Sequence, residues 1–266
     1  MRIFPIIVTY MTDIKDCNTY KSLICHYAER PMLIYDNSPI PINAKYKNKK
    51  TLYFHDKNNG GVSRAYNYGA KEAKRLGCFD FILLLDQDTI FEKDYIDKLE
   101  NCVNIYKDIN VFVPKIKYGK NRSFSPVLFK YMTLKGIDIE SGILSLNKYI
   151  PVNSGACINL NSFITVSGYN EKIKLDFADF DFFMRLKKYS DKFFLMDSTA
   201  FQDFSNEETD TEKLFCRYIL YIKGALNTSF KSKCSFHVLR HTISLTLRTK
   251  KFIFIKYYIN KYLFKK

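Results

Sequence analysis

Short apolar runs alternate with amphipathic stretches along most of the chain. The apolar runs fall at residues 3–10, 32–35, 52–54, 81–85 and 111–113. Continuous apolar segments of this length predict strands that are buried on both faces. Between them, residues 13–29, 63–76 and 92–106 show the spacing of amphipathic helices, with Ser63 as a candidate helix cap. The alternation predicts an α/β fold with a mostly parallel central sheet flanked by helices.

The pattern becomes less regular after the fifth apolar run. Residues 115–150 give no clear period, although strands are predicted near 142–145 and 156–160. Helices at 161–166 and 179–189 and a strand at 193–196 follow in the predicted order. From residue 211 the chain is predicted to be helical. We therefore expect an α/β domain over residues 1–210 and a basic, aromatic-rich helical extension over residues 211–266.

The positive charge of the chain is concentrated in this extension. The 266 residues carry a net charge of +15, and thirteen of the 42 Lys and Arg residues follow Glu212, after which no acid occurs. The first 212 residues are left with 29 bases and 27 acids, so the body is close to neutral. A nucleic-acid-binding protein with a uniformly basic surface would show a different distribution.

The cysteines and the N-terminus indicate a reducing compartment. The seven cysteines are scattered and contain no Cys-x-x-Cys pair. Residues 1–8 are too short for the apolar region of a signal peptide, and no apolar run reaches 18 residues. We therefore expect a cytoplasmic protein with reduced thiols.

Two carboxylates follow the most apolar strand. Asp86 and Asp88 flank Gln87 directly after residues 81–85. Carboxylate oxygens at the carboxyl end of a strand suit Mg²⁺ or Mn²⁺, which can bridge the phosphates of a nucleotide. Because many strands end in acidic turn residues, this motif alone is weak.

Two more segments suggest a nucleotide site. Asp36 ends the second predicted strand and could accept a hydrogen bond from a pyrimidine base, or it could only form an Asx turn. Asn59, Gly60 and Gly61 precede a helix, whose N-terminus favours anions. Arg64 could contact the donor or remain a solvated surface residue.

Three carboxylates surround the start of the helix predicted from residue 179. Asp176, Asp179 and Asp181 lie beside Phe and Met residues that would bury one helix face. Acids at this position complement the helix dipole. A rigidly held carboxylate here could also act as a general base for an acceptor hydroxyl.

The order of these motifs resembles the inverting family 2 glycosyltransferases with the GT-A fold, and within them the bacterial rhamnosyltransferase branch. The resemblance covers residues 3–205, and it is carried by residues 7–10, 36–38, 59–61, 67–70, 84–88, 153–156 and 176–185. It implies a hexosyltransferase-type enzyme of bacterial surface polysaccharide synthesis. The sugar would pass by a single displacement from a nucleotide-sugar donor to a saccharide or lipid-linked saccharide. The branch favours dTDP-rhamnose, with UDP-galactofuranose or a UDP-hexose as alternatives.

The resemblance also implies a role for each motif. Asp179 would be the catalytic base, and Asp88 would coordinate Mn²⁺ or Mg²⁺, with Asp86 in the metal shell or on the ribose. The donor nucleotide would contact Thr9, Tyr10, Asp36, Asn59, Gly60 and Arg64. The acceptor side would comprise Ser154, Gly155, Ala156, Asp176 and Asp181.

Histidine is missing where the family often has a metal ligand. Residues 200–203 contain no His, so Gln202 or Asp203 would have to replace it. Otherwise metal affinity would be weak, or the chain would be an inactive transferase-like scaffold. His237 and His241 are four residues apart, but no nearby acid or cysteine completes a metal site.

The extension interleaves Lys with large apolar residues over residues 249–266. This pattern favours peripheral attachment to the anionic inner face of the cell membrane. The alternative is that the aromatic residues pack on the body or on a second subunit of a homo-oligomer. Two other functions remain open: a nucleic-acid-binding protein, with the basic tail as its contact surface, and a nucleotidyltransferase. The segment after the first strand lacks the Gly- and Lys/Arg-rich triphosphate loop that the nucleotidyltransferase requires. We expect no nucleic-acid partner.

Overall fold

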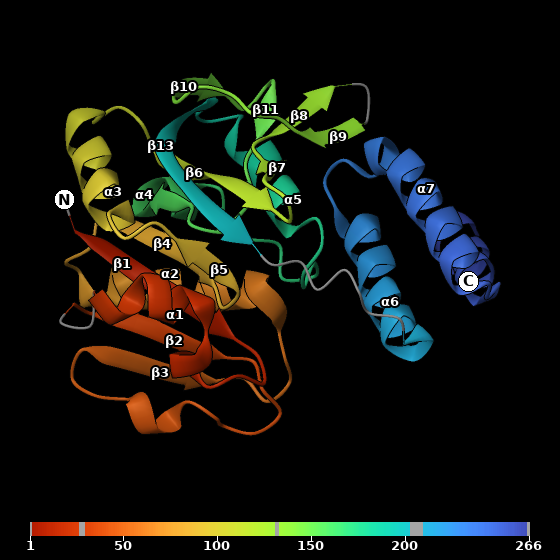
Figure 1. Cartoon of the computed structure of the whole chain (residues 1–266), viewed down its shortest axis with the longest axis horizontal. Coiled ribbons are helices and arrows are strands. Elements are labelled where there is room, and N and C mark those ends of the chain that lie inside the picture. Colours follow the sequence, from red (N-terminus) through yellow and green to blue (C-terminus); the bar gives the residue numbers. More distant parts are fainter. Residues whose placement is uncertain (1, 27–29, 131–132, 203–209, 265–266) are drawn as a thin grey trace.

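The protein folds around one large mixed sheet. The computed structural model describes residues 2–26, 30–130, 133–202 and 210–264. The main sheet has the strand order β10-β13-β6-β12-β4-β1-β2-β3, with β5 paired to β13 and β7 paired to β6. A smaller sheet has the order β11-β8-β9. Figure 1 shows the C-terminal helices standing at one side of this α/β body.

The strands are short and most connections are tight. Their bounds are β1 Ile3–Thr9, β2 Met32–Asp36, β3 Thr51–His55, β4 Phe81–Asp86, β5 Thr89–Phe91, β6 Val111–Tyr118, β7 Arg122–Ser125, β8 Val127–Lys130, β9 Thr133–Gly136, β10 Gly142–Ser145, β11 Tyr149–Ile150, β12 Cys157–Asn159 and β13 Lys192–Gln202. The α-helices are α1 Asn18–Ser22, α2 Gly61–Leu76, α3 Tyr95–Ile105, α4 Leu160–Thr165, α5 Ala178–Leu186, α6 Thr211–Asn227, α7 Lys231–Thr249 and α8 Ile253–Tyr257. A final π-helical stretch runs over Tyr258–Leu263.

The expected α/β fold is confirmed, and its mixed sheet has parallel pairs on both sides of β12, because β6 and β13 are also parallel to each other. Strands β4, β1, β2 and β3 are all parallel. In contrast, β12 lies antiparallel to both β4 and β6, and β10, β5 and β7 are antiparallel to their neighbours. Short hairpins and a returning strand form these antiparallel pairs, since such connections require antiparallel pairing.

Two hydrophobic cores explain why the central strands are continuously apolar. In β1, Phe4, Ile6 and Val8 face one core, while Ile3 and Ile7 face the other. Successive side chains of a strand point to opposite faces, so a strand with a core on each face needs apolar residues throughout. Helix α2 covers the first face and helix α3 covers the second.

Several predicted boundaries are corrected. Residues 13–29 do not form one helix: α1 spans only five residues between two 3-10 turns. Residues 115–150, which show no clear period, contain the second half of β6 and the strands β7 to β11. Strands β7 to β11 are two to four residues long, so they are too short to show a clear alternation. Ser63 is not the cap of α2, because the helix begins at Gly61 and the Ser63 hydroxyl donates to the Ile173 carbonyl at 2.5 Å.

The C-terminal helices are joined to the body by direct packing. The side chains of Tyr218 and Ile222 on α6 belong to the same buried cluster as the body residues Phe177 and Phe182. Gly224 permits this approach, because a Cβ atom there would lie 2.7 Å from the Asp176 carbonyl oxygen. The helical nature of residues 211–264 is therefore as expected, and part of the extension packs against the body.

The aromatic residues of the extension divide into two groups. Phe254 and Tyr258 are buried, whereas Phe252 is 77% exposed and Phe264 is 67% exposed. Within the part of the chain that the structure describes, no helix is both long enough and apolar enough to cross a bilayer.

The two ends of α2 provide a matched pair of glycine substitutions. Gly61 and Gly77 both have positive φ values, of 82° and 69°. A Cβ at Gly61 would lie 2.1 Å from the Lys174 carbonyl oxygen, whereas a Cβ at Gly77 has no heavy atom within 4 Å. Gly77→Ala should therefore cost about 1 kcal/mol of unfolding free energy from backbone strain alone. Gly61→Ala should cost at least about twice as much, measured by urea unfolding, and equal losses would contradict this account.

Candidate functional site

A pocket of about 390 Å³ lies beyond the carboxyl end of β4. It brings together polar residues from three separate predicted motifs, two of which contribute carboxylates. Its polar lining residues are Asp86, Asp88, Asn153, Ser154, Asp176, Asp179, Gln202 and Arg217. In α/β proteins, ligands usually bind beyond the carboxyl ends of the strands. The segments from β4, from the residues before β12 and from the start of α5 thus converge as the sequence predicted.

Asp86 connects three elements at the base of the pocket. Its carboxylate accepts a hydrogen bond from the Tyr66 hydroxyl of α2 at 2.8 Å and from the Ser154 hydroxyl at 2.5 Å. Tyr66 is completely buried, and burial next to Asp86 raises its pKa well above the usual value. The Tyr66 phenol therefore stays protonated, and by donating this hydrogen bond it fixes the position of the Asp86 carboxylate.

Asp88 lies opposite the last residue of β13. Gln202 lies opposite Thr89 in the antiparallel pair of β13 and β5. This pairing places the Gln202 side-chain amide 3.5 Å from the Asp88 carboxylate. Gln202 therefore stands where the sequence lacks the expected His. Asp203, the other predicted replacement, lies outside the described residues.

These residues fit a cation that is shared with a diphosphate, and not one enclosed by protein alone. Among the described residues, no group of three or more His, Cys, Asp or Glu side chains could hold a metal ion. Mg²⁺ and Mn²⁺ sites that carry nucleotide phosphates use one or two carboxylates together with phosphate and water oxygens. Asp88, Gln202 and Asp86 line the pocket and are the residues that would hold such a cation.

Asp179 has the ionisation expected of a general base. It lies in the first turn of α5 and lines the pocket. Burial, opposed by the hydrogen bond from the Phe180 amide and assisted by the nearby carboxylates of Asp176 and Asp86, raises the pKa of its carboxyl to about 7. A carboxyl with a pKa near 7 can both take up and release a proton at neutral pH.

Asp176 lies beside Asp179 at the mouth of the pocket. One carboxylate oxygen is 3.7 Å from the guanidinium of Arg217 on α6. The other oxygen is buried and has no hydrogen-bond partner within the described part of the chain. Arg217 is a pocket residue that the sequence analysis missed, because only the packing of α6 on the body brings it here.

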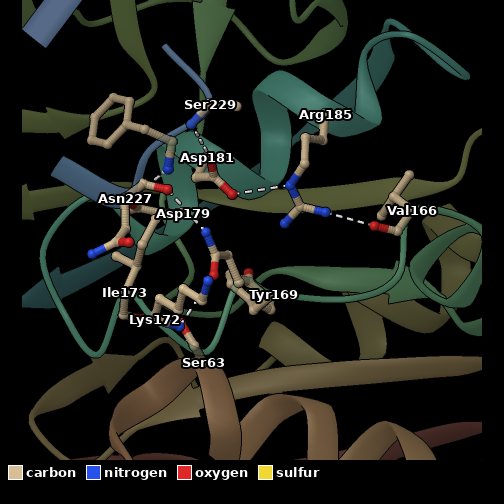
Figure 2. Close-up of polar contacts among 12 residues, drawn as sticks. Ser63, Val166, Tyr169, Lys172, Ile173, Asp179, Asp181, Arg185, Asn227 and Ser229 are labelled. Carbon is tan, nitrogen blue, oxygen red and sulfur yellow. Dashed lines mark hydrogen bonds and ion pairs between the residues drawn. The ribbon is translucent and has the colours of Figure 1, made fainter. Parts of the chain in front are cut away.

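Asp181 does not face the pocket, which corrects its predicted place on the acceptor side. Its side chain is almost completely buried. Figure 2 shows its carboxylate between the Arg185 guanidinium, at 2.9 Å, and the backbone amide of Ser229, at 2.8 Å. The Arg185 guanidinium also donates a hydrogen bond to the Val166 carbonyl at 2.6 Å. Asp181 therefore attaches α5 to the connection between α6 and α7.

Asp36 and Thr9 are also buried away from the pocket. The Asp36 carboxylate accepts hydrogen bonds from the amides of Ser38, Ile42 and Asn43 and from the Tyr53 hydroxyl. Burial acts to raise the pKa of Asp36, but these hydrogen bonds outweigh it and hold the pKa below its usual value. The Thr9 hydroxyl accepts a hydrogen bond from the Asn43 side chain. Asp36 thus organises the loop at residues 37–43, and its contact with a nucleotide base stays a prediction.

The loop before α2 depends on an acid that the sequence analysis missed. Asp56 follows β3 and accepts hydrogen bonds from the Asn58 and Gly60 amides, at 3.1 and 3.0 Å. Arg64 lies 3.6 Å from the same carboxylate, so its charge is directed to Asp56 and not to the pocket. An acid at a strand end four residues before a glycine is an Asx-turn signal that could have revealed this role.

The amide at the start of α2 is already engaged. The Val62 amide donates to the Lys174 carbonyl at 2.9 Å, and the Asn59 carbonyl accepts from the Lys174 ammonium. Val62 lines the pocket, but Asn59 and Gly60 do not. The expected anion contact at this helix end is therefore not preformed.

The middle residue of the acidic motif has a structural role. The Gln87 side chain accepts a hydrogen bond from the Tyr10 amide at 2.7 Å and donates to the Tyr10 carbonyl at 3.4 Å. This clamp fixes the end of β1 against the turn that carries Asp86 and Asp88. Tyr10 itself is 45% exposed and lies next to the pocket motif without lining the pocket.

The segment at residues 154–156 is bonded directly to β4. The Gly155 amide donates to the Leu84 carbonyl, and the Leu84 amide donates to the Ala156 carbonyl, both at 2.9 Å. Ala156 is fully buried, and the φ of Gly155 is 76°. Of the three residues in this segment that are assigned to the acceptor side, Ser154 alone lines the pocket, and Gly155 and Ala156 hold Ser154 in place.

The raised pKa of Asp179 makes a prediction about stability. The carboxyl has a pKa of about 7 in the folded protein and about 4 in an unfolded chain, so folding favours its protonated form. Its ionisation therefore removes stability as the pH rises from about 4 through 7. Asp179→Asn should increase the free energy of unfolding at pH 8 by on the order of 2–4 kcal/mol, with little effect near pH 4.

The neighbouring acid provides the control, with urea unfolding as the measurement. Asp181→Asn should destabilise the protein at pH 8 by about 3 kcal/mol, because it leaves the buried Arg185 contact without its carboxylate. If both variants lowered stability at pH 8, the proposed environment of Asp179 would be wrong.

Comparisons with known proteins agree with this architecture. The family model described as glycosyltransferase like family 2 matches residues 30–233. Among curated proteins, no sequence matches the chain. The crystal structure of S. aureus TarS 1-349 in complex with UDP is 16% identical, with a TM-score of 0.54, and the match covers 100% of this chain and 75% of that chain. TarS 1-349 in complex with UDP-GlcNAc is 15% identical, with a TM-score of 0.52 and coverage of 87% and 69%.

A second solved structure shares the same fold. GalNAc-T7, crystallised with UDP, GalNAc and Mn²⁺, is 12% identical with a TM-score of 0.57. The match covers 77% of this chain and 44% of that chain, so this chain spans less than half the length of GalNAc-T7. These similarities confirm the GT-A-like α/β fold. Since the family model matches most of the sequence, the chain belongs to the glycosyltransferase family 2-like proteins.

Proposed function

We propose that the protein transfers a sugar from a nucleoside diphosphate donor to an acceptor hydroxyl, with Asp179 as the general base. The observation that carries this proposal is the position of Asp179, whose pKa of about 7 suits proton transfer, in one pocket with Asp86 and Asp88. A divalent cation at Asp88 would supply charge neutralisation for the diphosphate. The Mn²⁺ and UDP in the GalNAc-T7 structure support this choice of cofactor and donor class.

The proposed reaction is a single displacement with inversion. The acceptor hydroxyl loses its proton to the Asp179 carboxylate as its oxygen forms a bond to the anomeric carbon. The bond from that carbon to the diphosphate oxygen breaks, and the nucleoside diphosphate leaves on the side of Asp88. Asp86, held by Tyr66 and Ser154, fixes the floor against which the donor lies. Asp176 accepts a second hydrogen bond from the acceptor through its unpartnered oxygen.

The donor is proposed by resemblance. The motifs around Asp86 and Asp88 favour dTDP-rhamnose, and UDP-galactofuranose and UDP-hexoses are the alternatives. TarS, with which the chain shares its fold, is described with UDP-GlcNAc, which supports a pyrimidine nucleotide. We place the reaction in bacterial surface polysaccharide synthesis, with a saccharide or lipid-linked saccharide as acceptor.

The mechanism predicts a pH-dependent rate and an inactive Asp179 variant. Because the base must be ionised, kcat/KM for transfer or donor hydrolysis should rise with pH and level off above about pH 7. Asp179→Asn should lower turnover at least about 100-fold, the contribution of a general base. A screen of dTDP-, UDP- and GDP-sugars with Mn²⁺ measures turnover, and calorimetry measures nucleotide binding.

Nucleotide binding provides the control, because the Asp179→Asn substitution affects proton transfer whereas removal of the cation affects binding of the diphosphate. Asp179→Asn should retain nucleotide binding, whereas EDTA should weaken it at least about tenfold if the cation carries the diphosphate charge. An active Asp179→Asn enzyme would contradict the assignment of the base. Failure of the unmodified protein both to turn over every donor and to bind any nucleotide would contradict the proposed function.

We also propose that the extension attaches the enzyme to an anionic membrane surface. Phe236, Ile243, Leu247 and Phe252 on and after α7 are between 45% and 77% exposed. Ile243, Leu247 and Phe252 line one surface hollow together with Lys250, which is exposed like the adjacent Lys251. Apolar side chains flanked by Lys suit the interface of an anionic bilayer.

Vesicle flotation tests this attachment. The protein should float with vesicles that contain phosphatidylglycerol and much less with phosphatidylcholine vesicles. The double variant Leu247→Glu/Phe252→Glu should remain in solution, because it places charge on the inserted surface. Ile105→Glu, at a 70% exposed apolar residue of α3, is the control and should float normally. Equal flotation of the double variant would disprove the attachment.

A further inference from the structure

A second pocket, of about 350 Å³, lies between α6 and α7 next to the catalytic pocket. The two pockets share Asp176 and Arg217 in their linings. Asp176 precedes the catalytic base by three residues, so a ligand in the second pocket reaches the point where the acceptor must present its hydroxyl. The second pocket is therefore continuous with the catalytic site and not a separate surface feature.

The second pocket has an aromatic floor and a cationic rim. The floor includes Tyr218, which is buried, and Tyr221, whose ring centroid is 4.6 Å from the His241 ring. Burial lowers the pKa of His241, and the charges of Arg217 and Arg248 oppose the raising effect of Asp176. Burial is the main cause of the lowered pKa of His241, and the cations that would attract an anion act in the same direction.

The rim carries more positive than negative charge. Lys213, Arg217 and Arg248 line it and are exposed, and among the lining residues that the structure describes Asp176 is the one carboxylate. Arg217 is directed to Asp176 at 3.7 Å. Within the described residues, Arg248 has no carboxylate within 4 Å. Such a rim suits a phosphate, because guanidinium and ammonium groups bind phosphate oxygens through charge-assisted hydrogen bonds.

The pocket faces away from the surface that we assign to the membrane. At 100° per residue, His241, Leu245 and Arg248 lie on one face of α7, whereas Ile243 and Leu247 lie on the opposite face. A phosphate bound at Arg248 therefore belongs to a ligand in the active-site region and not to the lipid headgroups under the apolar face.

We propose that this second pocket binds a phosphate group of the acceptor. The inference rests on the proposed function and names its acceptor class: a saccharide that carries a phosphate or diphosphate near the hydroxyl to be glycosylated. Lys213 and Arg248 bind the phosphate, and the sugar lies along Tyr221 and His241 toward Asp176. The hydroxyl then reaches Asp179 in the adjoining pocket. The C-terminal helices thus form the acceptor half of the active site.

His241 gives a readout that does not depend on activity. The chain has four His residues, so the imidazole resonance of His241 can be assigned with His241→Gln. With UDP and diamagnetic Mg²⁺ saturating the donor site, inorganic phosphate should shift this resonance saturably and raise the pKa of the imidazole. Arg248→Gln should weaken the phosphate affinity at least fivefold. Arg240→Gln, which removes an exposed cation of the same helix outside the pocket, should leave it unchanged.

A transfer assay tests the acceptor class. Between a hexose and its phosphate ester, the ester should be the better acceptor, and Arg248→Gln should raise the KM for the ester at least tenfold with a smaller change in kcat. A preference for the unphosphorylated hexose, no saturable shift of His241, or equal weakening by Arg240→Gln would overturn the proposal. A shift caused only by phosphatidylglycerol vesicles would also overturn it.

The failure of this inference can be separated from failure of the proposed function. If the unmodified protein neither binds UDP nor turns over a nucleotide sugar, the proposed function fails. If it does both, while phosphate leaves His241 unaffected, only the acceptor site is wrong.

Discussion

The Asp86 carboxylate accepts one hydrogen bond from Tyr66 and another from Ser154, and the whole pocket is organised around this arrangement. Tyr66 belongs to α2, Asp86 ends β4, and Ser154 precedes β12, so one carboxylate connects a helix, a parallel strand and an antiparallel strand. The phenol and the carboxylate are both largely removed from water, where an unpaired polar group is costly. The hydrogen bonds of Asp86 with Tyr66 and Ser154 therefore fix three chain segments relative to one another.

The same shielding from water has an opposite effect on the neighbouring acid. Asp179 is not neutralised by a cation, and burial together with Asp176 and Asp86 raises its pKa to about 7. Asp181, two residues later, is even less exposed but is paired with Arg185 and the Ser229 amide. Two acids in one helical turn thus take different roles because their partners differ. One is suited to proton transfer, and the other supports the fold.

The C-terminal helices connect stability with the site. Asp181 attaches the connection between α6 and α7 to the start of α5, and Gly224 lets α6 approach the Asp176 carbonyl closely. The Arg217 guanidinium reaches Asp176 from the same helix. Helix α6 is therefore part of the wall of the pocket beyond β4, where it contributes the cation Arg217, while other cations of the C-terminal helices are exposed to solvent. The proposed phosphate-binding pocket and the proposed membrane-facing surface lie on opposite faces of α7.

The sequence by itself determined the α/β class, the central strands and the motifs that meet in the pocket. Continuous apolar runs such as residues 81–85 are readable because both faces of the sheet are covered, and acids at strand ends mark the ligand-binding edge. Strands β7 to β11 were not predictable, since they are short and carry no clear period.

The roles of individual polar residues were decided by the tertiary structure alone. Asp36 ends a strand and Asp88 follows one, and Asp181, like Asp179, lies in the first turn of a helix. Asp36 and Asp181 accept internal hydrogen bonds, whereas Asp88 and Asp179 line the pocket. Arg217 enters the site from a segment more than thirty residues away from Asp179. Hydrogen-bond partners and charge environments come from segments that are distant in the chain, so local sequence patterns propose the reactive groups and three-dimensional packing selects among them.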